Sequence, residues 1–362
     1  MPVNHNMINA LLDNRIEAIR QEHKGGTSAE LDLSGGIDSL AMACILVLAL
    51  GPENVTLVHS RFNTNSAQTD RAQRLADALA CPLNDGDFSA VYEEILGVAI
   101  GAIGKAHGYK SETMQAVQQR MESDPTIKGS IRSTLRAPIG RMFLRLYGAV
   151  RRHGTGNECE DRWLRFYQKG GDGEVDSNPL AMLSKGEVYQ LCWFLSKRLP
   201  AAEGVILDTI KALPSPDLWG TGDGHSDEDE LLSWTGAPFT YSRINPETGE
   251  YNYVGTIERV SRFLDTPLNN PTAGWDMEAV ENVLFDDDSM LNDLSWPTVI
   301  TAAKQSGYFN DFSRSEVEAF LFAARKAERI TRHKMNPNCP SYGTREELVR
   351  KGILTNDLPV VG

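Results

Sequence analysis

The sequence lacks the spacings that mark disulfide frameworks and zinc sites. Its five cysteines are scattered without a C-x-x-C pair, and its seven histidines include no H-x-x-x-H spacing. Both kinds of site depend on such local spacing, so we expect reduced thiols and no dedicated transition-metal site. The longest apolar run, residues 40–50, is too short to span a bilayer, and the N-terminus lacks the layout of a signal peptide. These absences predict a cytoplasmic protein that does not enter a membrane.

Positive charge is also scarce. The chain of 362 residues carries 36 Lys and Arg against 49 Asp and Glu, which gives a formal net charge of −13. Proteins that bind nucleic acids gain much of their affinity by neutralising phosphates, so we expect no nucleic-acid partner. Any anionic ligand must then be held by a local basic pocket.

The most informative stretch that is present is S-G-G-I-D-S at residues 34–39. Residues 29–33 alternate in polarity before it and the apolar run follows it, a pattern that predicts a strand, a glycine turn and a buried helix. The first N–H groups of a helix point outward with the positive end of the helix dipole, and glycines let a phosphate approach closely. The stretch therefore predicts an anion cradle.

Two details refine this interpretation. No lysine follows the glycines, so the loop is not the common G-x-x-x-x-G-K-[ST] phosphate loop. The carboxylate of Asp38 would repel a bound phosphate, so its presence in an anion site is unexpected. A cation between the carboxylate and the phosphates would explain it. Mg²⁺ is the oxygen-seeking ion that usually lies there.

The segments around the loop indicate the fold class. Residues 8–19 place apolar side chains on one helical face, residues 55–59 are typical of a strand, and residues 67–79 are typical of a helix. This order is typical of an α/β fold, in which a doubly wound, mainly parallel sheet has helices on both faces. Residues 239–254 are predicted to form a hairpin.

Four further stretches carry hydroxyl and charged side chains in loops broken by glycine or proline. They are Gly154-Thr155-Gly156-Asn157 with Glu160; Lys169-Gly170-Gly171-Asp172-Gly173 with Asp176 and Lys185; Pro214-Ser215-Pro216-Asp217-Leu218 with the segment 226–231; and His333-Lys334 with prolines at 337 and 340. Each stretch alone is weak evidence for a function, whereas all four in this order along one chain are strong evidence.

The loop at 34–39 resembles the S-G-G-x-D-S signature of the ATP pyrophosphatases, and the four stretches resemble, in the same order, motifs of the NAD synthetases. The resemblance implies a Rossmann-like ATP pyrophosphatase fold with helical and hairpin insertions. Only about thirty residues precede the loop, which favours the ammonia-dependent form over the form with an N-terminal amidohydrolase domain. We therefore expect a single NAD synthetase-like domain over residues 1–362 without a glutaminase domain, with insertions near 92–131 and 233–311.

The activity implied by the resemblance is the amidation of deamido-NAD by ammonia. It would use ATP and Mg²⁺, pass through an adenylated intermediate, and give NAD, AMP and pyrophosphate. Family members are homodimers, so the resemblance also implies a homodimer.

The resemblance assigns roles to individual residues. Those implied to bind ATP are Ser34, Gly35, Gly36, Asp38, Ser39, Thr155, Lys185 and Ser215. Those implied to bind deamido-NAD are Arg141, Lys169, Asp176, His333 and Lys334. Asp38 and Glu160 would ligate magnesium, and Asp38, Asp172 and Lys185 are the candidate catalytic residues. We hypothesise that Asp172 faces ammonia and helps to present it as the neutral nucleophile.

The match departs from the family pattern in two places. Ile139 stands where family members have the first arginine of an A-R-x-R-M stretch, and Arg136 is the candidate replacement. Residues 151–153 replace the apolar strand before the G-T-G-N turn, which predicts a short or displaced strand. Two alternatives therefore stay open: another amidating ligase of the ATP pyrophosphatase type, and a catalytically silent nucleotide-binding homologue.

Overall fold

The computed structural model describes most of the chain, namely residues 5–124, 126–149, 151–215, 226–265, 280, 283–285, 295–331, 334 and 345–358. Among the helices of these residues, none is both long and apolar enough to cross a membrane. His333 and the segment 216–218, which the sequence assigns to two of the motifs, lie outside the described residues.

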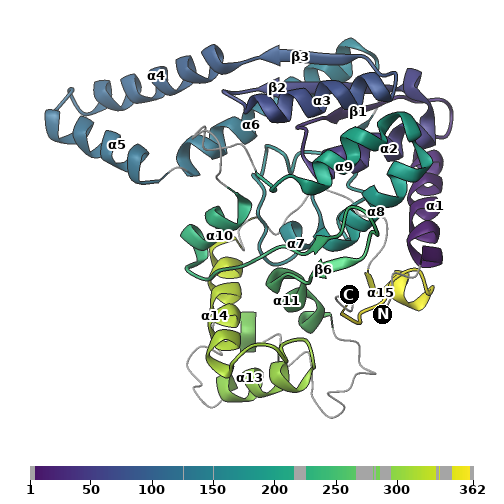
Figure 1. The fold of residues 1–362 in the computed structure, drawn as a ribbon. Helices are drawn as coiled ribbons and strands as arrows, with labels where there is room; N and C mark the ends of the chain where they lie inside the picture. Colours follow the sequence, from purple (N-terminus) through teal and green to yellow (C-terminus); the bar gives the residue numbers. More distant parts are fainter. Residues whose placement is uncertain are drawn as a thin grey trace.

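A four-stranded parallel sheet forms the centre of the first half of the chain (Figure 1). Its strands, in the order in which they pair, are β3 (Leu83–Asp87), β2 (Val55–Arg61), β1 (Ala29–Asp32) and β4 (Arg151–His153). β1 pairs with β2 from Ala29 opposite Val55, and with β4 from Ala29 opposite Arg151. The strand order changes direction at β1, and such switch points are where open α/β sheets bind ligands.

One face of the sheet is apolar and is covered by helices. α2 (Ile37–Leu50) packs on β1 and β2, and α1 (His5–Glu22) and α8 (Lys185–Arg198) pack on α2. α3 (Ser66–Ala78) and α9 (Glu203–Lys211) complete this layer. The side chain of Leu31 and most of the first ten residues of α2 are buried here, so this layer holds the larger hydrophobic core.

The opposite face of the sheet is covered by α6 (Thr126–Leu146), which packs on β1, β2 and β4. This face is ionic: the buried Arg152 of β4 pairs with Glu30 and Asp32 of β1. Because helices cover both faces, the predicted α/β, doubly wound and mainly parallel fold is confirmed. β4 has only three residues, as the polar sequence at 151–153 predicts.

A pair of helices extends away from the sheet (Figure 1). α4 (Ser89–Ala106) follows β3, and α5 (Ser111–Ser123) leads back towards α6. Most of the range 92–131 is thus helical and lies outside the sheet. The sequence analysis missed β3, because Leu83–Asp87 is too polar to give a strand pattern.

The second half of the chain forms another apolar core, built around Trp163, Phe239, Phe263 and Phe320. Its elements are α10 (Asp227–Thr235), α11 (Thr256–Leu264), α13 (Ser295–Gln305) and α14 (Arg314–Thr331). The predicted hairpin is confirmed as the antiparallel pair of β5 (Arg243–Ile244) and β6 (Tyr251–Tyr253). The last described helix is α15 (Arg345–Arg350).

Candidate active site

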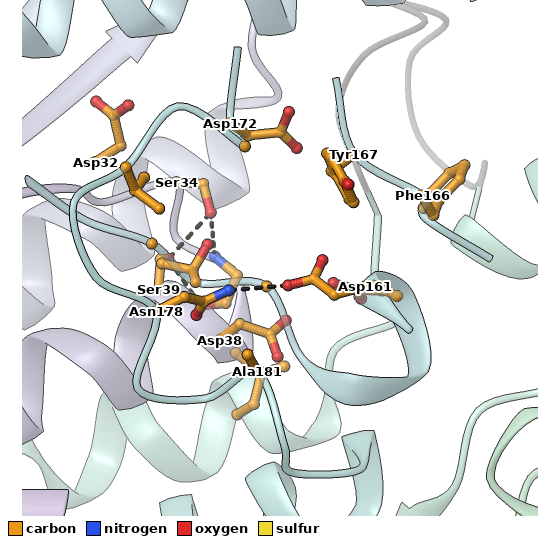
Figure 2. Close-up of a pocket in the computed structure, with 18 of the residues that line it drawn as sticks. Asp32, Ser34, Asp38, Ser39, Asp161, Phe166, Tyr167, Asp172, Asn178 and Ala181 are labelled. Atoms are coloured by element: carbon orange, nitrogen blue, oxygen red, sulfur yellow. Dashed lines mark hydrogen bonds between the residues drawn. The ribbon is translucent and has the colours of Figure 1, made fainter. Parts of the chain in front are cut away.

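The glycine loop has the predicted strand, turn and helix geometry. Gly35 adopts φ of +81°, and a Cβ at this position would collide with the backbone carbonyl of Gln68, so glycine is required. The Ser34 and Ser39 hydroxyls lie 3.0 Å apart, and Ser39 Oγ donates to the Gly36 carbonyl at 3.0 Å. Figure 2 shows Ser34, Ser39 and Asp38 gathered at this turn. These contacts hold the two hydroxyl groups in place beside the N-terminus of α2.

A cavity of about 770 Å³ opens in front of the loop. It lies beyond the carboxyl ends of β1 and β4, because both Asp32 and His153, the last residues of these strands, line it. Phe166 and Tyr167 contribute aromatic surface to the wall (Figure 2). Ligand cavities of 300–1,000 Å³ are the usual size for small molecules and cofactors, so a nucleotide fits this space.

Two carboxylates and one amine meet in the wall of this cavity. Lys185 Nζ lies 2.6 Å from Asp38 Oδ2 and 2.7 Å from Glu160 Oε1. Asp38 comes from the first turn of α2, Lys185 begins α8, and Glu160 lies on α7 (Glu158–Asp161). The side chain of Lys185 is only 3% exposed, whereas those of Asp38 and Glu160 are each 16% exposed. The carboxylates therefore stay in contact with the cavity.

The short helix α7 is held in place by an asparagine. Asn157 is its N-cap: its side-chain oxygen accepts a hydrogen bond from the Glu160 backbone N–H at 3.2 Å, and its Nδ2 donates to Asp38 Oδ1 at 3.1 Å. One side chain thus fixes the position of Glu160 relative to Asp38. The asparagine of G-T-G-N therefore joins the two candidate metal ligands.

Burial shifts several pKa values at this wall. Burial alone would lower the pKa of Lys185, but Asp38 and Glu160 raise it well above its usual value, so the amine stays charged. Burial raises the pKa of Glu160 and Asp161, and it raises that of Asp227 to about 8. Clustered carboxylates with raised pKa values are typical of functional sites.

A second ionic cluster lies at the base of α7 and α8. Arg345 of α15 pairs with Glu158 at 3.4 Å and with Glu187 at 3.0 Å, and Arg262 of α11 pairs with Glu187 at 2.9 Å. Glu187 also closes the capping box of α8 through Ser184. This cluster anchors the two helices that present Glu160 and Lys185.

Most of the residues assigned to ATP and catalysis come together. The cavity is lined by Ser34, Gly36, Asp38, Ser39, Thr155, Glu160, Asp172, Lys185 and Ser215. Asp172 Oδ1 accepts hydrogen bonds from Ser133 Oγ at 2.6 Å and from the Gln168 backbone N–H at 2.7 Å. Gly35 lies in the same loop, although it is not part of the lining.

The residues assigned to deamido-NAD are less concentrated, and those that are described do not line the cavity. Arg141 and Asp176 form a bidentate pair with each other at 2.7 and 3.0 Å, and Lys169 lies exposed on the loop before Asp172. Lys334 donates to the backbone carbonyls of Arg165 and Tyr167 at 3.0 and 2.5 Å. The Lys334 amine therefore supports the wall that carries Tyr167.

Sequence reasoning missed several residues at the cavity. Asp161, which lies beside Glu160, accepts a hydrogen bond from Asn178 at 2.8 Å (Figure 2). Arg136 lines the cavity, whereas Ile139 packs against the small apolar cluster around Phe62. The adjacency of Asp161 to Glu160 was a signal in the sequence, but the placement of Arg136 required the three-dimensional structure.

Comparison with known proteins places the chain in a family. The model of the NAD synthase family matches residues 10–243. The NH(3)-dependent NAD(+) synthetase of Methanosarcina acetivorans is 32% identical over 222 residues, which cover 60% of this chain and 74% of the relative. The enzyme of the same name from Methanocaldococcus jannaschii is 28% identical over 257 residues, which cover 71% of this chain and 85% of the relative.

Among solved structures, a glutamine-dependent NAD(+) synthetase from Cytophaga hutchinsonii resembles this chain with a TM-score of 0.54 and 14% identity. The match covers 92% of this chain and 51% of that one, and at this identity it supports the fold alone. The family match spans the glycine loop, α7 and the start of α8, the elements that bring Asp38, Glu160 and Lys185 together. The chain belongs to the NAD synthase family.

Proposed function

We propose that this protein catalyses the ATP-dependent amidation of deamido-NAD with ammonia, and that it releases NAD, AMP and pyrophosphate. The observation that carries the proposal is the contact of Lys185 with Asp38 and Glu160 beside the glycine loop. The NAD synthase family match, and relatives named NH(3)-dependent NAD(+) synthetases, agree with it.

The chemistry explains why such a site needs charges and no enzyme nucleophile. A carboxylate is a poor acyl donor, so its oxygen must first attack the α-phosphorus of ATP, breaking the bond to pyrophosphate and forming a mixed anhydride with AMP. The lone pair of ammonia then attacks the carbonyl carbon, AMP leaves, and the nitrogen loses a proton. Both steps depend on positioning and on neutralising phosphate charge.

ATP is proposed to bind at the glycine loop and the residues beside it. The N-terminus of α2 and the Ser34 and Ser39 hydroxyls would hold the outgoing pyrophosphate. Lys185, which stays charged, would neutralise phosphate oxygens. Thr155 and Ser215, both in the cavity wall, would contact the rest of ATP.

The donor set suits a magnesium ion. Asp38 and Glu160 place carboxylate oxygens around one cationic nitrogen, and hard oxygen ligands of this kind are what Mg²⁺ prefers. Asp38 and Glu160 would hold the ion, which when bound would offset the charge that builds on the leaving pyrophosphate.

Deamido-NAD and ammonia are proposed to bind at the part of the cavity that Asp172 and Arg136 line. Asp172 lines the cavity and would face ammonia, accepting the proton that the nitrogen loses. Arg136 is proposed to replace the arginine that is missing at Ile139, since its side chain lines the cavity. Arg141, Asp176, Lys169, His333 and Lys334 are proposed to contact the dinucleotide beyond the cavity.

We also propose that the protein works as a homodimer in the cytoplasm. Exposed apolar side chains on α4 and the following turn, namely Val91, Val98 and Tyr109, support a subunit interface on this helical pair. Light scattering in solution tests the dimer, and a monomer at micromolar concentration would contradict it. The four cysteines of the described residues are free thiols, which suits a reducing compartment.

The function is tested with pure protein, ATP, Mg²⁺, ammonium and deamido-NAD. AMP and NAD should form together in equal amounts, and neither should form when deamido-NAD is left out. AMP release without deamido-NAD would indicate a ligase for another acid. No AMP under any condition would indicate a silent homologue.

A further inference from the structure

A cluster of potential metal ligands lies at the edge of the cavity, which His153 lines, where α1 ends beside β4. Among the described residues, Glu22, His23 and His153 each offer one ligand atom, and these atoms lie within 4.8 Å of one another. Glu22 is the last residue of α1 and His23 begins the turn after it, whereas His153 is the last residue of β4. We propose that these three side chains form a binding site for a divalent ion of the zinc type, distinct from the magnesium ligands proposed at Asp38 and Glu160.

The two imidazoles are already arranged as a pair. His23 Nε2 lies 2.9 Å from His153 Nε2, and the ring centroids are 5.2 Å apart. Two imidazole nitrogens on one tetrahedral zinc, each at 2.0–2.1 Å, lie about 3.3 Å apart. A few tenths of an ångström of separation, with a rotation of the rings that turns both Nε2 atoms toward one point, would therefore replace the contact between the rings with a shared ion.

The state of the His23 ring also suits ligation. His23 Nδ1 lies 2.9 Å from the carbonyl oxygen of Thr27, which places the ring proton on Nδ1 and leaves Nε2 with its lone pair. Metal-binding histidines usually make such a bond from their other nitrogen. His153 then donates from Nε2 to His23, so its proton must move to Nδ1, which has no hydrogen-bond partner among the described residues, before its Nε2 binds an ion. Burial lowers the pKa of His23 and lowers that of His153 to about 3.

The carboxylate is held by two neighbours. Ser177 Oγ donates to Glu22 Oε2 at 3.0 Å, and Arg151 Nη1 lies 3.2 Å from Glu22 Oε1. Arg151 competes with an ion for this carboxylate, but its side chain is 39% exposed and can turn into solvent. Glu22 is 10% exposed, so an ion reaches the two buried imidazoles from this side.

An ion at this position would fasten α1 to the frame of the active site. His153 directly precedes the G-T-G-N turn, and the Gly154 backbone N–H donates to the Ser177 carbonyl at 2.7 Å. The predicted role is therefore structural, and its expected sign is a higher melting temperature in the presence of the ion.

The probe is Zn²⁺ itself, added to the chelator-treated full-length protein in excess Mg²⁺ so that the magnesium ligands are occupied. One zinc should bind per chain, and His153→Gln should weaken binding by about tenfold to a hundredfold. His107→Gln, which changes an exposed histidine in the turn after α4, is the matched control and should bind zinc as the wild type does. Equal binding by the His153→Gln variant, or no binding by the wild type, overturns the proposal.

A second measurement avoids variants that might misfold. X-ray absorption of the zinc-loaded wild type should show two imidazole nitrogens at about 2.0–2.1 Å. Nitrogen-15 spectra of the histidines should change for two of the seven residues. A zinc spectrum with oxygen ligands only, or histidine signals that do not move, would show that His23 and His153 share only a hydrogen bond.

Discussion

Two buried ionic clusters line the same cavity, the anchoring cluster through Glu158 and Arg345, and they differ in the exposure of their carboxylates. In the cavity cluster, the carboxylates of Asp38 and Glu160 are each 16% exposed and share the amine of Lys185. In the anchoring cluster, Glu187 is 8% exposed and is held by the planar guanidinium groups of Arg262 and Arg345. Carboxylates that reach the cavity can exchange the Lys185 amine for a ligand ion, whereas Glu187 is held by two arginines that stay charged at any pH. The cavity cluster therefore serves chemistry, and the anchoring cluster serves the fold.

The largest expected effect comes from breaking the anchoring cluster. Arg262→Met should lower the free energy of unfolding by about 3–5 kcal/mol, because it removes the buried cation beside Glu258 and leaves Glu187 with Arg345 alone. Denaturant unfolding measures this change. If the variant were as stable as the wild type while its activity fell, the two clusters would have the same role and the comparison would fail.

The second largest effect should be on turnover and not on stability. Glu160→Gln should reduce turnover by about a hundredfold or more, because it removes one carboxylate of the cavity cluster, while the unfolding free energy changes little. Steady-state rates of AMP release measure turnover, and a thermal melt measures stability. The control is Glu203→Gln, which neutralises a surface carboxylate that is 42% exposed and should preserve activity.

The third effect is a pH dependence of stability, which comes from a buried carboxyl group in the cavity wall. Asp227 lines the cavity, and burial raises its pKa to about 8, so the folded protein holds a proton there that the unfolded chain loses near pH 4. Stability should therefore fall as the pH rises from about 4 to about 8, by at most about 1.4 kcal/mol per pH unit.

Asp227→Asn removes this dependence. Its advantage in melting temperature over the wild type should grow through the same pH range and stay constant above it. An advantage that is the same at pH 5 and pH 8 would mean that Asp227 is ionised throughout.

The smallest effect should come from an ion pair outside both clusters. Arg74 lies 2.6 Å from Asp208 on the surface, where both side chains are about half exposed. Arg74→Gln should change the unfolding free energy by less than about 1 kcal/mol and leave turnover unchanged. A loss as large as that of Arg262→Met would show that burial does not separate the clusters.

The sequence predicted the parts of the site that are local. The turn at residues 34–39 is set by glycine stereochemistry and by the apolar run that follows it, so the loop and α2 could be predicted without coordinates. Lys185 and Glu160 were found through motif spacing, and the structure brings both to Asp38.

What the sequence could not predict depends on distant pairs and on weak local patterns. Arg345 meets Glu187 across 158 residues, and His23 meets His153 across 130. No local spacing marks such pairs. β3 was missed because Leu83–Asp87 is polar and forms a strand only by pairing with β2. Arg141 and Asp176 were assigned to the substrate, and only the coordinates reveal that they pair with each other.

The most direct test is a crystal structure with Mn²⁺ and a non-hydrolysable ATP analogue, in which anomalous scattering locates the ion. We predict one manganese bound by carboxylate oxygens of Asp38 and Glu160, next to the phosphates at the N-terminus of α2, with Lys185 Nζ moved onto a phosphate oxygen. Nucleotide bound elsewhere, or Lys185 still between the two carboxylates with no ion beside them, would contradict the proposed site.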